Sequence, residues 1–370
     1  MSRFPTPLDC VQNIASYQPG KPIEELAREL SLDPETIVKL ASNENPLGCS
    51  ELVAQEVSRE LSEVARYPDG GGYILKNRLS SKLGIPLDSL ILGNGSNDIL
   101  EMAAIAFLDH DRSAIYSEFC FVVNKLATQT RAAEGIEVRS MSYGHDLERM
   151  YDAIRDDTRI IFISNPNNPT GTFIPPTEIL RFIESVPEHI LVILDEAYYE
   201  YLPENLQSDS VNWIKRFPNL LVTRTFSKIY GLASFRVGYG MANPSLAEVL
   251  NRVRQPFNVN SYGLAAAAAA LSDDAFVRAS VQANNIGMRQ LVSVAEKLEL
   301  AYIPSHGNFL TIEFKQAGIE VYTKLLERGI IVRPLGGYGL PYHLRVSVGL
   351  ESENERLCVA LESLINSLAD

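Results

Sequence analysis

The chain has 370 residues and a formal net charge of −13, with 46% hydrophobic and 21% charged residues. This length and composition predict a globular protein with a substantial core, built as two domains or as one large and one small domain. The negative charge, together with the lack of a basic run in the sequence, argues against nucleic acid as a partner.

Cysteine, histidine and apolar patterns exclude several further classes of protein. The cysteines are scattered, which fits a reducing compartment and gives neither a disulfide nor a zinc pattern. The histidines show no metal-ligand spacing, so no metal site is expected. The N-terminus lacks the apolar core of a signal peptide and no apolar run is long enough to span a bilayer. We therefore expect a cytoplasmic protein without a membrane partner.

The first part of the chain predicts an arm followed by two loops of unusual composition. Residues 1–42 are rich in proline, hold one expected helix over 23–30, and are predicted to form an N-terminal arm. Residues 40–48 form a turn with side-chain amides and a proline, and a helix is expected over 50–64. The glycines of 66–73 permit a close approach to another surface, although this segment could equally be a flexible loop.

From residue 90 the chain alternates between strands and helices. Strands are expected from 90 and over 113–116, 136–140, 159–164, 189–194, 220–222 and 237–241. Helices are expected over 99–107 and 246–253 and from about 121, 147 and 177. This alternation predicts an α/β fold whose mainly parallel sheet is covered by helices on both faces.

The last third of the chain predicts a second, smaller domain. An alanine-rich helix around 265–270 precedes a long amphipathic helix over 274–298. Strands at 309–314, 330–333 and 343–348, with helices at 319–327 and 352–368, predict an α+β C-terminal domain. The expected division is an arm (1–42), a large domain (43–255) and a small domain with its bridging helix (256–370).

Polar motifs stand where strands of the expected parallel sheet end, which is where binding sites of such sheets form. The turn 164–171 carries two prolines and presents Asn168, and Asp195 ends the next strand. Lys228 follows the strand 220–222 within the segment 223–236. Three such features at consecutive strand ends favour a functional site.

Lys228 and its neighbours predict a particular cofactor. A lysine at a strand end can form an imine with an aldehyde, although lysine in this position is more often a surface residue. Thr225, Ser227 and Arg236 could hold a phosphate beside it, and the glycine turn 93–98 could add the free amides of a helix start. Together with Asp195, this combination indicates pyridoxal 5'-phosphate (PLP).

Eight segments together resemble the fold-type I PLP-dependent aminotransferases, and within them the histidinol-phosphate aminotransferase family. They occur in the family order and span nearly the whole chain, at 43–48, 66–69, 93–98, 164–171, 195–198, 225–228, 235–240 and 344–349. The resemblance implies transamination between histidinol phosphate and 2-oxoglutarate in histidine biosynthesis, by a homodimer with shared active sites.

Two alternatives to this function stay open at the level of sequence, and a third is disfavoured. An aromatic amino-acid aminotransferase of the same family shares most of the motifs. A PLP decarboxylase of a phosphorylated amino acid would share the cofactor site. A non-catalytic PLP-domain regulator would need an added nucleic-acid-binding module, for which 1–42 is too short and too rich in proline.

The resemblance implies a role for each residue at the cofactor ring. Lys228 would hold PLP as an imine and then move the proton of the substrate's alpha carbon. Asp195 would pair with the pyridine nitrogen and keep it protonated. Asn168 and Tyr198 would hydrogen-bond the phenolic oxygen, and Phe119 would stack on the ring.

The resemblance also implies phosphate and substrate contacts. The cofactor phosphate would be held by Gly95, Ser96, Asn97, Thr225, Ser227, Arg236 and Tyr67 of the partner subunit. Arg345 would bind an alpha-carboxylate, because a guanidinium fork matches carboxylate geometry. Arg333, with Tyr17 of the partner subunit, would bind the distal phosphate, near Asn43 and Asn45. The chain departs from the family pattern at Asn124, Ser234, Phe235 and His343.

Overall fold

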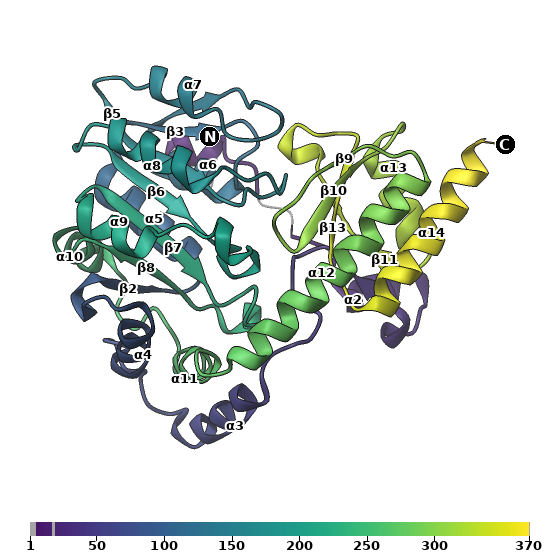
Figure 1. Ribbon diagram of the computed structural model, residues 1–370, viewed down its shortest axis with the longest axis horizontal. Helices are drawn as coiled ribbons and strands as arrows, with labels where there is room; N and C mark the ends of the chain where they lie inside the picture. Colours follow the sequence, from purple (N-terminus) through teal and green to yellow (C-terminus); the bar gives the residue numbers. More distant parts are fainter. Residues whose placement is uncertain (1–4, 17–18, 370) are drawn as a thin grey trace.

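The computed structural model describes residues 5–16 and 19–369, which form a large and a smaller region joined by a long helix (Figure 1). The large region contains a seven-stranded sheet of order β2-β8-β7-β6-β5-β3-β4. Its strands are β2 (Leu90–Gly93), β3 (Ser113–Ser117), β4 (Glu134–Val138), β5 (Thr158–Ser164), β6 (Leu191–Asp195), β7 (Leu220–Thr225) and β8 (Gly238–Ala242). Only β8 runs antiparallel to its neighbours, β2 and β7, so the expected mainly parallel sheet is confirmed.

Helices cover both faces of this sheet because alternate residues of each buried strand point to opposite sides. Ile193 and Leu221 belong to the core cluster under α5 (Ser96–Phe107), α6 (Val122–Thr130) and α10 (Pro244–Val253). Leu194 and Val222 belong to the cluster on the other face. That second cluster includes residues of α3 (Glu51–Glu60), α4 (Tyr73–Leu83), α7 (Leu147–Asp152), α8 (Pro176–Ser185), α9 (Ser210–Arg216) and α11 (Ser261–Ala270).

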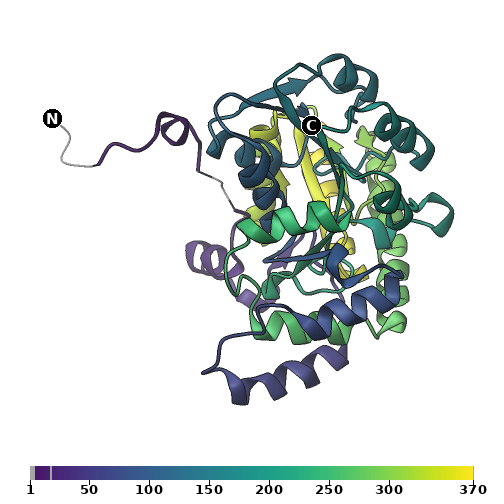
Figure 2. The ribbon, with the colours of Figure 1, turned by 90° about the vertical axis from the view of Figure 1, so that its left-hand side faces the viewer.

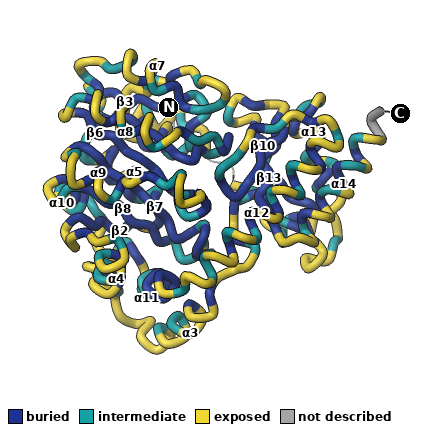
Figure 3. Tube along the Cα trace, viewed as in Figure 1, coloured by how far each residue is buried: buried dark blue, intermediate teal, exposed yellow. Residues whose placement is uncertain are grey.

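The smaller region is an antiparallel sheet packed on helices. Its strand order is β12-β13-β10-β9, formed by β9 (Tyr302–Ile303), β10 (Phe309–Glu313), β12 (Arg333–Pro334) and β13 (His343–Ser347). The helices are α12 (Asp274–Lys297), α13 (Gly318–Leu326) and α14 (Glu351–Ala369). Ile312 and Val346 pack in the core between sheet and helices, and Figure 3 shows β6 and β7 of the large region and β13 of the smaller one as buried. Residues that alternate with these along the strands, such as Arg345 beside Val346, therefore point to the other face of the small sheet, toward the large region.

The N-terminal part contains α1 (Asp9–Gln12), α2 (Ile23–Leu30) and β1 (Val38–Lys39). Figure 2 shows the segment with α1 at one side of the molecule, leading away from α2. Strand β1 pairs in parallel with β11 (Ile330–Ile331), and α11 contacts α3 and α4 beside the large sheet. The division at residues 42 and 255 stays a prediction. Strand β1 lies before residue 42 but pairs with β11 of the small region, and α11 lies after residue 255 but packs beside the large sheet.

Several elements differ from the expected boundaries. The helix expected over 99–107 begins at Ser96, and the helix expected over 50–64 is α3 followed by a short 3-10 turn, Leu61–Glu63. Helix α4 was not expected, because Leu75 and Leu79 are its only buried residues and leave a weak apolar stripe. Nor was the short α9. Within the described residues, no helix combines the length and apolar character needed to cross a membrane.

Candidate active site

A cavity of about 240 Å³ lies at the carboxyl ends of β5, β6 and β7, beside the first turn of α5. The order of the parallel strands brings these ends together, as is typical of such sheets. Nine of the residues expected at the cofactor line this cavity: Ser96, Asn97, Asn168, Asp195, Tyr198, Thr225, Ser227, Lys228 and Arg236. Residues more than one hundred positions apart in the sequence thus form one site.

Lys228 lies in the turn that follows β7 and reaches into the cavity. Its Nζ donates a hydrogen bond to the backbone oxygen of Ser42 at 3.2 Å and lies 6.0 Å from the centre of the Tyr198 ring. Burial lowers the pKa of the Lys228 amine to about 8, and the positive charge of Arg345 acts in the same direction. The amine is therefore easier to deprotonate than an exposed lysine, as a nucleophile requires.

Asp195 ends β6 with its side chain on the cavity side of the sheet. Its carboxylate is buried and accepts a hydrogen bond from Oγ1 of Thr223 at 2.9 Å. Burial raises the pKa of Asp195 to about 6, which the Thr223 contact opposes. A positively charged N–H group placed against this carboxylate would lower its pKa again, because an opposite charge favours the ionised form.

The small sheet reaches the wall of this cavity through Arg345, which contacts the lining residue Asn168. Nη1 of Arg345 donates to Oδ1 of Asn168 at 2.5 Å, and Nη2 donates to the backbone oxygen of Ala41 at 2.8 Å. Next to them, Nδ2 of Asn43 donates to the Tyr198 hydroxyl at 2.9 Å. Burial raises the pKa of Tyr198 to about 12, so its hydroxyl keeps its proton at neutral pH. Asn43 thus orients the hydroxyl of Tyr198, which lines the cavity.

The opposite end of the cavity is shaped for an anion. Gly95 precedes α5 with a φ of +82°, and a Cβ there would lie 2.5 Å from Nη2 of Arg236. Nη1 of Arg236 donates to Oγ of Ser227 at 3.3 Å, and Oγ1 of Thr225 accepts from the Ser227 amide at 3.1 Å. Helix α5 starts without a side-chain cap, so amides of its first turn point outward beside a guanidinium and hydroxyls.

Phe119 and Asn45, expected at the cofactor ring and the substrate, do not line the cavity. Phe119 packs against Tyr143 with a centroid distance of 5.9 Å, whereas Phe121 lines the cavity. Asn45 is buried away from it, and its Nδ2 donates to the Ile229 backbone oxygen at 2.8 Å and to Oγ of Ser280 at 2.9 Å. The stacking role of Phe119 and the substrate role of Asn45 stay predictions.

Two residues expected to act with the substrate or across subunits lie elsewhere, and a third is outside the described residues. Arg333 lines a separate cavity formed by the N-terminal arm, helix α6 and the small region. Tyr67 is 83% exposed and stacks on Phe257, with centroids 4.8 Å apart. Tyr17 lies outside the described residues.

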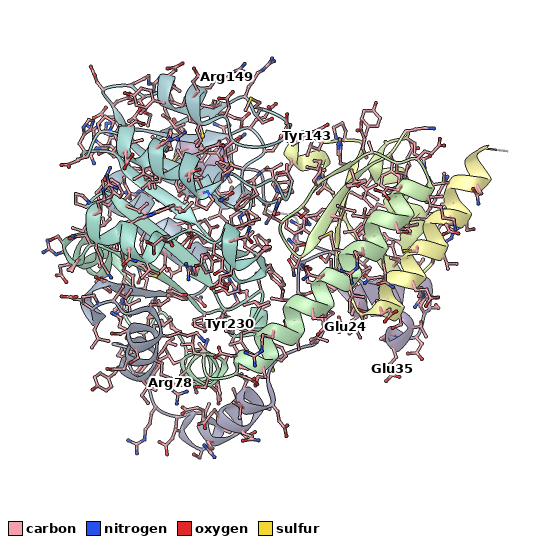
Figure 4. The ribbon with its side chains drawn as sticks, viewed as in Figure 1. Glu24, Glu35, Arg78, Tyr143, Arg149 and Tyr230 are labelled. Atoms are coloured by element: carbon pink, nitrogen blue, oxygen red, sulfur yellow. The ribbon has the colours of Figure 1, made fainter. Side chains whose placement is uncertain are left out.

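The structure adds cavity residues that the sequence did not single out. Ser42 and Glu44 line it, and so does Ser164, whose buried Oγ has no hydrogen-bond partner among the described residues. Ser164 is the last residue of β5 and the register partner of Asp195. Its position at the end of an expected strand could therefore have predicted its place in the cavity. Tyr143, which Figure 4 shows at the edge of the large region facing the smaller one, also packs against His343 at 5.7 Å.

Comparison with known proteins places these features in context. The family described as "Aminotransferase class I and II" matches residues 35–361. Histidinol-phosphate aminotransferase 2 of Nitrosospira multiformis is 51% identical, covering 97% of this chain and 93% of that protein. Histidinol-phosphate aminotransferase 1 of Thiobacillus denitrificans is 53% identical, covering 96% and 92%. The crystal structure of histidinol-phosphate aminotransferase from Sinorhizobium meliloti, in complex with PLP, has a TM-score of 0.90 at 25% identity, covering 100% and 99%.

Proposed function

Because the chain belongs to the class I and II aminotransferase family, we propose that it is a PLP-dependent aminotransferase acting on histidinol phosphate and 2-oxoglutarate in histidine biosynthesis. The names of its relatives at about 50% identity support this substrate. The observation that carries the proposal is the cavity that brings Lys228, Asp195 and an anion-binding helix start together.

The donor set of the cavity fits PLP at three places. The first turn of α5, Ser227 and Arg236 offer hydrogen-bond donors to a phosphate dianion. Asp195 offers a buried carboxylate to a protonated ring nitrogen, and Ser164 has an unused hydroxyl inside the cavity. The missing Cβ of Gly95 leaves the space that the approach of Arg236 requires. These features support assigning the cofactor-binding roles to the residues named above.

The residues of the cavity then divide the work of transamination. When bound, PLP supplies an electron-accepting ring that stabilises negative charge on the substrate carbon bearing the amine. Nζ of Lys228, whose pKa is lowered by burial to about 8, can take the proton from that carbon and return it. The Tyr198 hydroxyl, oriented by Asn43, donates a hydrogen bond into the cavity, and Arg345 and Asn168 hold one wall in place.

The covalent role of Lys228 is tested by chemical reduction. Borohydride should fix the cofactor to the enzyme, and peptide mapping should find the added mass on the peptide that contains Lys228. The reason is that, among the lysines of the described residues, only Lys228 combines a lowered pKa with a place beside Asp195 in the cavity. Lys82, which is paired with Asp274 at 2.7 Å, provides a lysine expected to stay unlabelled. Label on another lysine would contradict the assignment, and a protein without any bound cofactor would contradict the function.

The substrate is tested by comparing amino donors with 2-oxoglutarate as acceptor. Histidinol phosphate should be turned over with a higher kcat/KM than phenylalanine or tyrosine. A preference for the aromatic amino acids would replace the proposed substrate while keeping the reaction. Release of carbon dioxide without formation of glutamate would indicate a decarboxylase instead.

We further propose that the enzyme is a cytoplasmic homodimer. Its four cysteines are free, which fits a reducing compartment. Large exposed apolar side chains gather along α3, the following 3-10 turn and α4, where Leu61, Val64, Tyr73 and Ile74 are more than half exposed. An apolar surface of this kind is typical of a subunit interface. Tyr67 lies in the same part of the chain.

A further inference from the structure

A buried ion pair lies on the reverse face of the large sheet, directly behind the cavity. Glu196 and Arg224 follow Asp195 and Thr223 in the chain, and since successive side chains of a strand alternate, they point away from the cavity. Nη2 of Arg224 lies 2.8 Å from Oε2 of Glu196, and the two side chains are 4% and 3% exposed. Among the described residues, no other ion pair has both side chains buried to this extent.

Hydrogen bonds and a ring contact hold both members of this pair. Nε of Arg224 also donates to Oε2 of Glu196 at 2.9 Å, and the guanidinium lies 3.4 Å from the centre of the Tyr199 ring. Oγ of Ser210 accepts from Nη2 of Arg224 at 3.2 Å and donates to Oε2 of Glu196 at 2.9 Å. Ser208 donates to the other oxygen, Oε1. Both carboxylate oxygens, the Nε and Nη2 groups of the guanidinium and its flat face are thus engaged.

The pair is connected to the cavity through two neighbouring strands. Asp195 and Thr223 are partners in the parallel register of β6 and β7. The Glu196 amide donates to the Thr223 backbone oxygen at 2.8 Å, and on the cavity side Thr223 donates to Asp195 at 2.9 Å. Arg224 stands between Thr223 and the cavity residue Thr225. The ion pair therefore joins the ends of β6 and β7 at the point where both supply cavity residues.

We propose that Glu196 and Arg224 are positioning residues, which hold the ends of β6 and β7 so that Asp195 and Thr225 are placed for the cofactor. This inference rests on the proposed function, because PLP is the ligand that it concerns. Stability alone is a poor account of the pair, since apolar residues of similar volume often stabilise a protein at least as well as a buried ion pair. A planar guanidinium fork instead supplies directional contacts that apolar side chains lack.

The test compares two Arg→Lys changes in the full-length enzyme. Arg224→Lys keeps the charge but loses the paired Nε and Nη2 donors to Oε2 of Glu196 and the flat contact with Tyr199. Arg155→Lys is the matched control, since Arg155 forms a fork with Glu134 at 3.0 and 2.7 Å on the exposed surface. If Asp195 is misplaced and its charge-assisted hydrogen bond to the cofactor is lost, the affinity for PLP should fall by roughly tenfold. We expect Arg224→Lys to raise the dissociation constant of PLP by about that factor and to shift the pH midpoint of the bound cofactor's absorbance.

The KM for the amino donor should stay near the wild-type value in both variants, because the substrate arginines lie on the small sheet. Arg155→Lys should also leave the PLP dissociation constant and the pH midpoint unchanged. A second comparison separates positioning from stability. The double variant Glu196→Leu with Arg224→Met replaces the pair by apolar groups. It should melt near the wild-type temperature but bind PLP more weakly than the wild type does.

Three outcomes would overturn the inference. One is a lower melting temperature for Arg224→Lys with wild-type PLP affinity and pH midpoint, which would make the pair a purely structural contact. Another is wild-type PLP binding by the double variant. If Arg224→Lys fails to fold, Ser210→Ala removes one shared contact and should shift the same two quantities by a smaller amount, so wild-type values there would also contradict it. Failure of the wild-type enzyme to bind PLP would instead contradict the proposed function itself.

Discussion

At the scale of single residues, burial moves the two groups of opposite charge in the cavity toward neutrality. It lowers the pKa of Lys228 to about 8 and raises the pKa of Asp195 to about 6. Each shift is a cost to the folded protein without cofactor, because burial destabilises the charged form that each group still adopts at neutral pH. A ligand that forms a bond with the amine and pairs with the carboxylate removes both costs. The cavity is therefore built to gain stability when PLP binds.

Replacement of Lys228 should reveal the cost of its burial. The pKa of the folded state lies below that of the unfolded state, about 8 against 10.5, so the charged amine destabilises the folded protein at every pH below about 8. Lys228→Met without cofactor should therefore melt at a higher temperature than the wild type without cofactor at pH 7. The difference should shrink as the pH rises from 8 to 10.5, where the unfolded amine also loses its proton. Thermal melts over this pH range check the prediction, and a Met variant that is less stable at pH 7 would contradict it.

At the scale of elements, the small antiparallel sheet determines where the substrate cations lie. Arg333 and Arg345 are direct partners in the register of β12 and β13. Directly opposed residues of an antiparallel pair place their side chains on the same face, so both arginine side chains leave the small sheet from one face. Arg345 reaches Asn168 at the main cavity, while Arg333 lines the cavity beside the arm. This arrangement supports one cationic face that takes either the phosphate of the donor or a carboxylate of the acceptor.

Loss of Arg333 should therefore weaken the binding of histidinol phosphate in particular. Removing one charge-assisted hydrogen bond costs about 1.5–3 kcal/mol, or roughly ten- to hundredfold in affinity. We expect Arg333→Ala to raise the KM for histidinol phosphate by this factor and to change the KM for phenylalanine less. Lys21→Ala is the matched control, since Lys21 lines the same cavity but is paired with Glu29 at 2.6 Å. Unchanged turnover of histidinol phosphate by Arg333→Ala would exclude Arg333 from the site.

The elements also show which parts of the site a sequence can predict. Asn168, Asp195 and Lys228 were found because the ends of parallel strands meet at one edge of a sheet, and strand ends can be read from local patterns. The ion pair behind them was not, because Glu196 and Arg224 are recognisable as partners only once the neighbours of β6 are known. Long-range pairing has no local signal. The boundaries of short elements such as α9 fail for a similar reason, since tertiary packing decides them.

At the scale of the whole molecule, the loop that carries Tyr67 is ordered yet does not serve its own cavity. The Asp69 carboxylate accepts from the amides of Gly71 at 2.8 Å and Tyr73 at 2.6 Å, which fixes the loop at the start of α4. Tyr67 itself points outward, 83% exposed, with only the Phe257 ring beside it among the ring contacts of the described residues. A rigid loop that presents a tyrosine from an apolar surface is suited to complete a site in a second copy of the chain.

A mixture of two inactive variants tests this arrangement. A tyrosine hydroxyl can donate to the cofactor phosphate, whereas an aspartate would repel it, so Tyr67→Asp should weaken PLP binding and Lys228→Ala should abolish the covalent attachment. If Tyr67 acts across the interface, one site of each mixed dimer carries both lesions and the other carries neither. Unfolding and refolding the variants together should then restore activity to about a quarter of the sites, since half of randomly formed dimers are mixed. Lys228→Ala mixed with Asp195→Ala is the control that should stay inactive, because both residues line the cavity of one chain. An inactive mixture of the first two variants, or a fully active monomer in a measurement of molecular size, would show that Tyr67 does not complete a partner's site.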